Sequence, residues 1–522
     1  MSDMACRASA IALTGLDGTV VQVEAAASNQ LPGMAIIGLP DASLTEAKLR
    51  VRQAAQQVGL ALTDRFLVVN LSPAALPKHG SGFDLAIALA SLAASKQMPS
   101  DRLTSVAHIG ELGLDGGLRR PPGLLSAVLA ARRHGFSTVM VPAVCAQEAA
   151  LVPNITVVAA ETLRDAVDWY RGVVGNWHIA QPGSAKEGTE TDAATTKQSF
   201  ADPDIAEVIG QPEAVEALII AAAGRHHLSM IGPPGAGKTL LATRLASILP
   251  DLSDEESITA SSIASLGGST LTELVRRPPF ESPHHTASAV SIIGGGDSSG
   301  VRPGAVTKAC HGVLFLDEAP EFPRGVLDAL RQPLETGTVE IHRAKVRTTL
   351  PAHAQLVLAA NPCPCGNAGT VNAEDPCRCT PSQRVRYLGR LSGPLTDRID
   401  LRINIRRVSS VLLDGDVVPT ITSEEARKRV LHARKRASAR LNGTPWRVNG
   451  EVRGEWLRAP ANRLPRAATA VIDAALARGS LTVRGYDRVL RLAWTLADLA
   501  EKTAPDRAEL RHALALRGGA AL

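Results

Sequence analysis

The residues best suited to carry chemistry lie in the run IGPPGAGKT, at positions 231–239. This run contains the spacing G-x-x-x-x-G-K-[ST], in which glycines let the backbone curl so that successive N–H groups point at phosphate oxygens. Lys238 is expected to reach the β- and γ-phosphates of ATP, Thr239 to ligate Mg²⁺, and the helix that begins at Lys238 to add its positive end. The residues predicted to bind the nucleotide are Gly232, Pro233, Pro234, Gly235, Ala236, Gly237, Lys238 and Thr239. The alternative is a glycine turn before a buried helix.

A second set of chemical residues follows an apolar run, Val313–Leu316, that is bounded by Gly312 and Pro320. Such a run is typical of a buried parallel strand, and open α/β sheets bind ligands beyond the carboxyl ends of their strands. Asp317 is therefore expected to hold Mg²⁺ through water, and Glu318 to orient and activate the water that attacks the γ-phosphate. An acid pair that only caps a helix is the alternative interpretation.

A third apolar run, Gln355–Ala360, predicts another strand and ends in Asn361. An amide at the tip of this strand can position the attacking water against the γ-phosphate. The same pattern also occurs where a strand simply enters a loop, so the role of Asn361 depends on the two earlier motifs. In this order, the three motifs predict ATP hydrolysis.

Seven cysteines, four of them close together, indicate a reducing environment, and we expect a cytoplasmic protein. The clustered four form the pattern C-x-C…C-x-C, and four thiolates in a short polar loop can hold Zn²⁺ in a tetrahedron. The alternative is a redox-active or merely local cluster, because C-x-C is tighter than the common C-x-x-C spacing. The candidate ligands are Cys363, Cys365, Cys377 and Cys379, whereas Cys6, Cys145 and Cys310 are expected in the core.

The bulk properties of the chain exclude several classes of protein. It has 522 residues, 45% hydrophobic and 20% charged, with a formal net charge of +5. These values predict several globular domains and only a weak preference for an anionic partner. No apolar run reaches the roughly 18 residues that a membrane span requires. The apolar stretch at the start of the chain lacks the basic region of a signal peptide, so we expect it to form a first strand. Aromatic residues make up 3%, which disfavours a binder of single-stranded nucleic acid built on stacking.

A polar stretch without hydrophobic periodicity, residues 181–199, predicts a linker between two folded parts. We expect an N-terminal α/β domain at 1–178, a linker at 179–203, a parallel-sheet core with a phosphate loop at 204–410 and an α-helical C-terminal lid at 411–522. The N-terminal domain alternates alanine-rich helical stretches with short β-rich runs. These runs are Val20–Glu24, Phe66–Leu71, Val106–Leu112, Thr138–Val141 and Ile155–Val158.

The C-terminal part follows Asp400–Ile405, which is expected to be the last strand of the core. Thr422 and Glu425 form a capping box that opens a helix dense in arginine and lysine. This helix presents either a phosphate-binding face or a solvated surface. Further helices are expected at Ala467–Arg478 and Arg484–Lys502, and the segment Asp204–Gln211 is a candidate for the wall of the adenine pocket.

With these residues assembled, the chain resembles AAA+ ATPases of the magnesium-chelatase clade and, more narrowly, the bacterial ComM (YifB) family. The resemblance runs over nearly the whole chain. It implies a ring, expected to be a hexamer, in which ATP binds between subunits. The segments that carry the resemblance are Gly232–Thr239, Ser282–Thr286, Val313–Phe322, Ala360–Gly366 and Leu391–Asp400.

The resemblance also assigns roles to two arginines. Arg398 matches the arginine finger, which completes the ATP site of a neighbouring subunit, and a guanidinium suits this role because it stays charged and spreads over the γ-phosphate oxygens. Arg484 matches the lid arginine known as sensor 2. For each of the two, a surface salt bridge is the alternative.

The segment 337–347 matches a hairpin that lies before Asn361 in this clade and can project into the central pore. In that position Arg343, Lys345 and Arg347 would meet a nucleic-acid backbone. Alternation of apolar and basic residues is also what any half-exposed hairpin shows, so DNA contact and a plain hairpin both remain open.

The N-terminal domain resembles the proteolytic domain of Lon, in which a serine–lysine pair performs nucleophilic catalysis. In the aligned pattern Gly82 stands at the serine and Leu125 at the lysine, while Ser81 is one position away and has no evident partner. The domain is therefore expected to keep the fold without the protease chemistry, and to organise the ring or to bind a protein partner.

The resulting hypothesis is a ring-forming ATPase that moves on single-stranded, duplex or branched DNA. The resemblance implies branch migration or helicase activity in the integration of transforming DNA. Alternatives are a chelatase-type motor for porphyrin metallation, a protein-remodelling or Lon-like machine, and a scaffold; the presence of Lys238, Asp317 and Glu318 argues against the scaffold. His284 and His285 match the family pattern, but no metal partner is evident for them.

Overall fold

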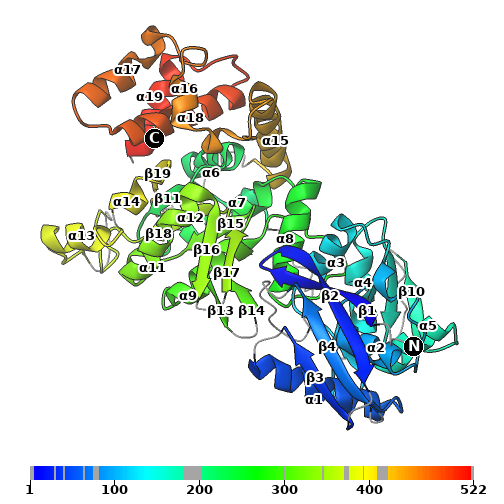
Figure 1. The fold of residues 1–522 in the computed structure, drawn as a ribbon. Helices are drawn as coiled ribbons and strands as arrows, with labels where there is room; N and C mark the ends of the chain where they lie inside the picture. The colour runs from blue at the N-terminus through cyan, green and yellow to red at the C-terminus, as the bar shows by residue number, and fades with distance from the viewer. Residues whose placement is uncertain are drawn as a thin grey trace.

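The computed structural model describes residues 5–28, 31–38, 41–62, 65–73, 82–181, 203–297, 300–343, 346–369, 376–391, 393–407 and 421–518. Figure 1 shows an N-terminal α/β part in blue and cyan, a central α/β core in green and yellow, and a helical C-terminal part in orange and red. The predicted fold class is confirmed, with a parallel-sheet core between the other two parts. Within the described residues, no helix combines the length and apolar character that a membrane crossing requires.

The N-terminal part is built on a mixed sheet of eight strands in the order β10-β9-β8-β5-β1-β2-β4-β3. Alternate residues of its second strand are buried, because side chains of a strand point to opposite faces. Helix α2, by contrast, is buried at every position, which fits its almost unbroken run of alanine, leucine and isoleucine. The strands are β1 (Cys6–Thr14), β2 (Asp17–Ser28), β3 (Gly33–Ile37), β4 (Phe66–Ser72), β5 (Val106–His108), β8 (Thr138–Pro142), β9 (Thr156–Ala160) and β10 (Trp177–Ala180).

Among the described residues, α-helices and a small hairpin complete this part. The first strand and the five predicted runs are present, but the run Val106–Leu112 is divided between β5 and β6, which belong to different sheets. Strands β3 and β10 were not predicted, and β10 extends the sheet to Ala180, just beyond the predicted boundary at 178. Most of the predicted linker lies outside the described residues, so the domain boundaries remain a prediction. The remaining elements are α1 (Asp41–Gln57), α2 (Asp84–Ala94), β6 (Glu111–Leu112), β7 (Leu118–Arg119), α3 (Leu124–Arg133), α4 (Ala146–Ala150) and α5 (Leu163–Arg171).

The core sheet has five parallel strands in the order β12-β15-β18-β11-β19. Strands β15 and β18 are buried at every residue, as expected for apolar runs covered on both faces. Because the strands are parallel, the ends of β11, β15 and β18 meet at one edge of the sheet. The strands are β11 (Leu228–Ile231), β12 (Phe280–Glu281), β15 (Val313–Leu316), β18 (Gln355–Ala360) and β19 (Leu401–Asn404).

Helices and two hairpins surround this sheet. The hairpin expected at 337–347 is present as β16 paired with β17, with Ile341 opposite Thr348. The helices of the core are α6 (Pro212–Gly224), α7 (Lys238–Ile248), α8 (Asp254–Leu266), α9 (Ala289–Ile293), α10 (Ala305–Lys308), α11 (Arg324–Ala329), α12 (Arg331–Thr336), α13 (Pro381–Leu388) and α14 (Gly393–Thr396). Its hairpin strands are β13 (Gly294–Asp297), β14 (Gly300–Pro303), β16 (Thr338–Arg343) and β17 (Val346–Pro351).

The C-terminal part consists of helices, as predicted. Thr422 caps α15 by accepting from the backbone N–H of Glu425, whose side chain accepts from Thr422 in return. The apolar faces of these helices share one hydrophobic cluster with α6, α7 and β11 of the core. The helices are α15 (Ser423–Arg440), α16 (Gly454–Arg458), α17 (Arg466–Ala477), α18 (Val483–Leu499) and α19 (Arg507–Gly518).

The arginines of α15 are used inside the chain. Arg427 and Arg434 donate to the backbone carbonyls of Ser247 at 3.2 Å and of Ala222 at 3.0 Å. The other contacts follow the same pattern: Arg429 pairs with Glu216 at 2.8 Å, Arg436 donates to the Lys502 carbonyl at 2.6 Å and Arg440 pairs with Asp498 at 2.6 Å. These contacts join the C-terminal helices to one another and to the core. They favour a structural role over a phosphate-binding face.

The N-terminal part packs against the core through α3 and α8, which lie side by side in Figure 1. The N–H of Leu125 donates to the Ser265 hydroxyl at 3.2 Å, and Leu271 of the core joins an apolar cluster made mainly by the N-terminal part. Arg120 donates to the carbonyls of Gly268 at 3.0 Å and Ser269 at 2.6 Å. The two parts therefore share a packed interface.

Candidate nucleotide site

The phosphate loop connects β11 to α7, as predicted. Gly235 and Gly237 adopt left-handed backbone conformations, with φ of +74° and +85°, that other residues rarely adopt. Gly232 is required for a different reason, since a Cβ at this position would lie 2.6 Å from the carbonyl oxygen of Ile405. The glycines thus supply both the curl of the loop and the close approach to the chain after β19.

Lys238 lies where the loop meets the tip of β18. Its ammonium donates to the carbonyls of Gly232 at 2.7 Å and Pro233 at 3.0 Å, and to the Asn361 Oδ1 at 3.0 Å. Burial lowers the pKa of Lys238, and the nearby carboxylates of Asp317 and Glu318 oppose this effect. The structure therefore brings together Lys238 and Asn361, the two residues that were each expected to act near the γ-phosphate.

The predicted magnesium ligands are also in contact. The hydroxyl of Thr239, at the start of α7, donates to the Asp317 Oδ2 at 2.8 Å. The other oxygen of Asp317 accepts from the N–H of Glu318 at 2.9 Å, which fixes the carboxylate at the end of β15. A hydroxyl and a carboxylate side by side are the oxygen ligands that Mg²⁺ uses next to phosphates. These two residues fit the ion predicted for them.

Glu318 occupies a backbone conformation that is uncommon for its residue type. Its φ is +49°, in the left-handed region, and its side chain is 50% exposed. Such strain concentrates at functional sites. The His285 Nδ1 lies 3.5 Å from the Glu318 Oε2, and the rings of His284 and His285 are 4.1 Å apart. Sequence reasoning assigned no partner to these histidines, because their loop carries no periodic or spacing signal that points to Glu318.

The two arginines assigned by resemblance meet at one acid. Arg398 is ion-paired with Glu335, and Arg484 lies 3.9 Å from the same carboxylate. Burial lowers the pKa of Arg398, whose side chain is 7% exposed, whereas Arg484 is 68% exposed. Glu335 belongs to α12 and Arg484 to α18, so this acid joins the core to the C-terminal helices. Their roles toward ATP remain predictions.

The segment before the phosphate loop is fixed at both ends. The Gln211 amide donates to the carbonyls of Ala236 at 2.9 Å and Arg406 at 3.1 Å. Asp204 accepts from the N–H of Ser423, the first residue of α15, at 2.8 Å. The segment therefore links the phosphate loop to the C-terminal helices, which suits the predicted wall of the adenine pocket.

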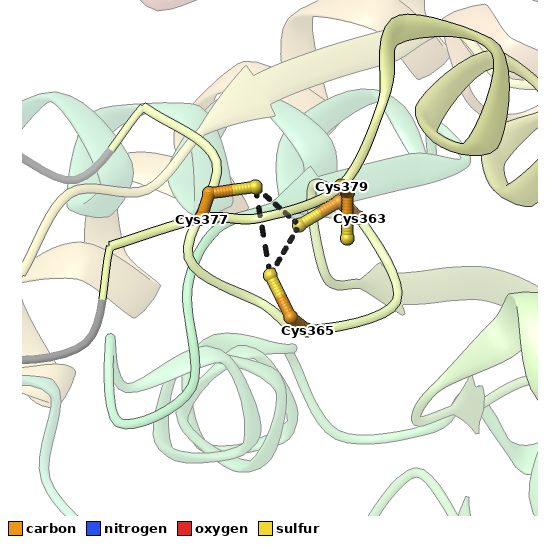
Figure 2. Close-up of side chains that lie close together, drawn as sticks. All are labelled: Cys363, Cys365, Cys377 and Cys379. Carbon is orange, nitrogen blue, oxygen red and sulfur yellow. Dashed lines mark hydrogen bonds between the residues drawn. The ribbon is translucent and has the colours of Figure 1, made fainter.

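The candidate zinc ligands come together in space. The sulfurs of Cys363, Cys365, Cys377 and Cys379 all lie within 4.8 Å of one another. Figure 2 shows the four side chains close together in the loop after β18. Of the three cysteines expected in the core, Cys145 and Cys310 are buried, and burial raises the pKa of Cys145 to about 12. Cys6 is only partly buried, because it lies at the start of β1.

The basic hairpin and the degenerate protease positions are described only in part. Lys345 and Ser81 lie outside the described residues, and Arg347 is exposed on β17 opposite His342. Gly82 precedes α2, and a Cβ there would find its nearest neighbour, Pro121, at 4.0 Å. Leu125 is buried in α3 at the interface with α8, so the position of the lysine is filled by packing.

Comparison with known proteins shows which family the chain resembles. Three family models match successive parts of the chain: "Subunit ChlI of Mg-chelatase" at 23–144, "Magnesium chelatase, subunit ChlI" at 204–412 and "Magnesium chelatase, subunit ChlI C-terminal" at 420–517. The chain is also 32% identical over 143 residues to the Lon protease of Mycolicibacterium smegmatis, a match that covers 26% of this chain and 18% of that protein. This shorter similarity supports the Lon-like fold of the N-terminal part.

Longer similarities cover nearly the whole chain. The competence protein ComM of Haemophilus influenzae is 37% identical over 511 residues, covering 96% of this chain and 95% of that protein. The uncharacterized protein YifB of Escherichia coli is 37% identical over 513 residues, covering 97% and 96%. An uncharacterized protein of Mycobacterium tuberculosis is 45% identical over 516 residues, covering 98% of both chains.

Proposed function

Because the chain belongs to the ComM/YifB family of magnesium-chelatase-like AAA+ ATPases, we propose that it is the subunit of an ATP-driven motor that acts on DNA. The observation that carries the ATPase is the convergence of Lys238, Thr239, Asp317 and Asn361 at one edge of the parallel sheet. DNA as the substrate is supported by the similarity to a competence protein. The proposed task is branch migration, with helicase-like activity, during the integration of transforming DNA.

The chain's own residues divide the work of hydrolysis. The N–H groups of the loop and the Lys238 ammonium bind the phosphates of ATP and compensate the charge that develops as the γ-phosphoryl group leaves. Thr239 and Asp317 would hold Mg²⁺, which would supply further neutralisation of the charge on the phosphate oxygens. Glu318 accepts a proton from the attacking water, and the Asn361 amide orients that water. The 50% exposure of Glu318 leaves its carboxylate accessible to water.

We propose that the ring is a hexamer and that Arg398 acts on the ATP of the neighbouring subunit. Within the chain, the guanidinium groups of Arg398 and Arg484 both lie next to the carboxylate of Glu335. Binding of ATP at the subunit boundary would draw the guanidinium of Arg398 from Glu335 to the γ-phosphate. This exchange would connect the C-terminal helices to the state of the nucleotide through Arg484.

The DNA contact that we propose is the hairpin β16–β17. Arg343 ends β16 and Arg347 is exposed on β17, while Lys345 lies outside the described residues. The arginines of the basic helix α15 bond within the chain, which favours a structural role for that helix. We further propose a cytoplasmic location, where DNA and ATP are both present, and a protein partner for the N-terminal part.

A second candidate function is a motor that remodels a protein or drives a chelatase. The family models favour it, because their descriptions name a magnesium-chelatase subunit. This alternative predicts ATP hydrolysis that responds to a protein partner and is indifferent to DNA.

The deciding experiment is ATP hydrolysis by the purified full-length chain with no DNA, single-stranded DNA, duplex DNA and a four-way junction, at low and moderate salt. We expect stimulation by DNA that weakens as salt rises, because contacts between basic side chains and phosphates release counterions. The matched variant is Arg347→Ala, which should reduce stimulation without changing hydrolysis in the absence of DNA. Hydrolysis that is indifferent to every DNA would contradict the DNA motor and leave the ATPase standing.

A further inference from the structure

The four cysteines of the loop after β18 form a compact cluster of sulfurs. The Cys363 Sγ lies 3.3 Å from that of Cys365 and 3.7 Å from that of Cys377, and the Cys365 and Cys377 sulfurs are 3.5 Å apart. Figure 2 shows the sulfurs of Cys363, Cys365 and Cys377 joined by dashed lines, with the side chain of Cys379 beside them. Cys363 is buried, and Cys365 lies at the surface.

These distances fit a metal site better than a pair of disulfides. A disulfide brings two sulfurs to about 2.05 Å, well below the spacings in the cluster. In a tetrahedral zinc site with Zn–S bonds of about 2.3 Å, neighbouring sulfurs lie about 3.8 Å apart. We propose that the four thiolates of Cys363, Cys365, Cys377 and Cys379 bind one Zn²⁺, and that this structural metal holds the loop against the phosphate loop.

The surroundings of the sulfurs support the metal. The Arg384 guanidinium, on α13, donates to the Cys377 Sγ at 3.4 Å and to the Cys379 carbonyl at 3.2 Å. Backbone N–H groups of Asn367 and Ala368 donate to the sulfurs of Cys365 and Cys363. Four thiolates around Zn²⁺ carry net negative charge, which these donors and the guanidinium offset.

The loop that would hold the metal touches the nucleotide site at two points. Asn361, which accepts from Lys238 at 3.0 Å, stands two positions before the buried ligand Cys363. Gly366, between the two pairs of cysteines, packs directly on the phosphate loop: a Cβ there would lie 2.5 Å from the Pro234 Cδ. A metal that fixes Cys363 and Cys365 therefore fixes both the tip of β18 and the contact with Pro234. Asn361 is the residue through which zinc would act on hydrolysis.

The metal itself is tested on the full-length chain without reference to activity. After washing with a weak chelator, we expect about one zinc per chain by mass spectrometry, and replacement by Co²⁺ should give the visible absorption of a tetrahedral thiolate site. Cys365→Ser and Cys377→Ser should each lose the metal, whereas Cys6→Ser, outside the cluster, should retain it. Less than about half an atom of zinc per chain, or iron in its place, would overturn the proposal.

Two glycines test whether the cysteine loop affects ATP hydrolysis through its contact with the phosphate loop. Both have a left-handed backbone, but only Gly366 lies against Pro234. Gly366 and Gly369 have φ of +81° and +78°, yet a Cβ on Gly369 meets nothing within 4 Å. Gly366→Ala should keep its zinc and lower kcat for ATP hydrolysis about tenfold, with a smaller change in KM, because a misplaced positioning group affects the reacting geometry more than binding. Gly369→Ala, with the same backbone strain, should stay within about twofold of the wild type in kcat.

A double-mutant cycle separates positioning from general damage. Asn361→Ala should retain zinc, and combining it with Gly366→Ala should reduce kcat little further, because both changes remove the same positioned amide. Equal kcat values for Gly366→Ala and Gly369→Ala, or fully additive losses in the cycle, would overturn the coupling. If the wild-type chain hydrolyses no ATP under any condition, the proposed ATPase fails, while the zinc content still decides the metal site.

Discussion

Two regions of the molecule occupy positions that serve catalysis in proteins of similar fold, and they differ in what their polar groups contact. At the nucleotide site, Lys238 and Thr239 reach across to Asn361 and Asp317 on neighbouring strands. At the start of α2 in the N-terminal part, Gly82 carries no side chain. The nearby Asp84 is buried and bonded to Arg50 at 2.7 Å.

The two regions differ in whether their polar side chains converge on a shared site. In the core, the polar groups converge on a shared edge, and Glu318 remains accessible to water. In the N-terminal part, the side chain of Leu125 fills the position aligned with the Lon lysine, and its backbone N–H donates to Ser265 of α8. We infer that the N-terminal part contributes mechanical support and the core contributes catalysis.

The largest effect is expected for Lys238→Ala. This change removes the ammonium that bonds two loop carbonyls and Asn361, and with it the main positive charge near the γ-phosphate. Hydrolysis should fall at least about 1000-fold, and MgATP should no longer raise the melting temperature of the protein. Retained stabilisation by MgATP would show that the loop binds nucleotide without its lysine.

Glu318→Gln should separate binding from hydrolysis. The amide keeps the size of the side chain and its left-handed backbone, but it cannot accept the proton of the attacking water. We expect ATP to bind with near wild-type affinity and hydrolysis to slow about 100- to 1000-fold, measured as single-turnover release of phosphate. Hydrolysis at the wild-type rate would assign the base to another residue.

The contrast also shows what the sequence could predict. The phosphate loop was predictable because its glycine spacing is contiguous and its backbone conformations follow from residue type alone. The contacts of Thr239 with Asp317 and of Lys238 with Asn361 join distant segments, but parallel strands bring their carboxyl ends to one edge, so elementary sheet geometry predicts them.

Other contacts could not be predicted from the geometry of the sheet. The meeting of Arg398 and Arg484 at Glu335, and of His285 with Glu318, depends on how irregular loops pack. The arginines of α15 looked solvated or phosphate-binding, because sequence shows their charge but not the backbone carbonyls that they reach. The Lon-like alignment places Gly82 and Leu125 at the serine and lysine positions, yet it could not show that Leu125 lies at an interface with α8.

Arg120→Ala tests the mechanical role of the N-terminal part. Arg120 pairs at 2.9 Å with Glu148, whose side chain is fully buried, and also bonds two carbonyls of the core. Its removal leaves a buried carboxylate without its partner and should destabilise α3 and α4 by about 3 kcal/mol, measured by hydrogen exchange in the full-length chain.

The matched control is Arg133→Ala, because Arg133 is 61% exposed and lies 3.9 Å from an exposed Asp17. It should change the same local stability by less than about 0.5 kcal/mol. If Arg120→Ala also left exchange in α3 and α4 unchanged, the ion pair would not support this interface. The inference that the N-terminal part contributes mechanical support would then be contradicted.

The smallest effect concerns the pH dependence of the buried Asp84. Burial raises the pKa of Asp84 to about 6, although Arg50 and the Leu112 N–H oppose this effect. Because the folded pKa exceeds the ordinary value of 3.8, the native state binds more protons than the unfolded state between these two values, so stability falls as pH rises through this window. Between about pH 4.5 and pH 7, the advantage of the wild type over Asp84→Asn should shrink by about 2 kcal/mol in hydrogen exchange of α2. A pH-independent difference would mean that Arg50 holds the carboxylate ionised throughout, as an active-site pair would, and the two regions would be more alike than their contacts suggest.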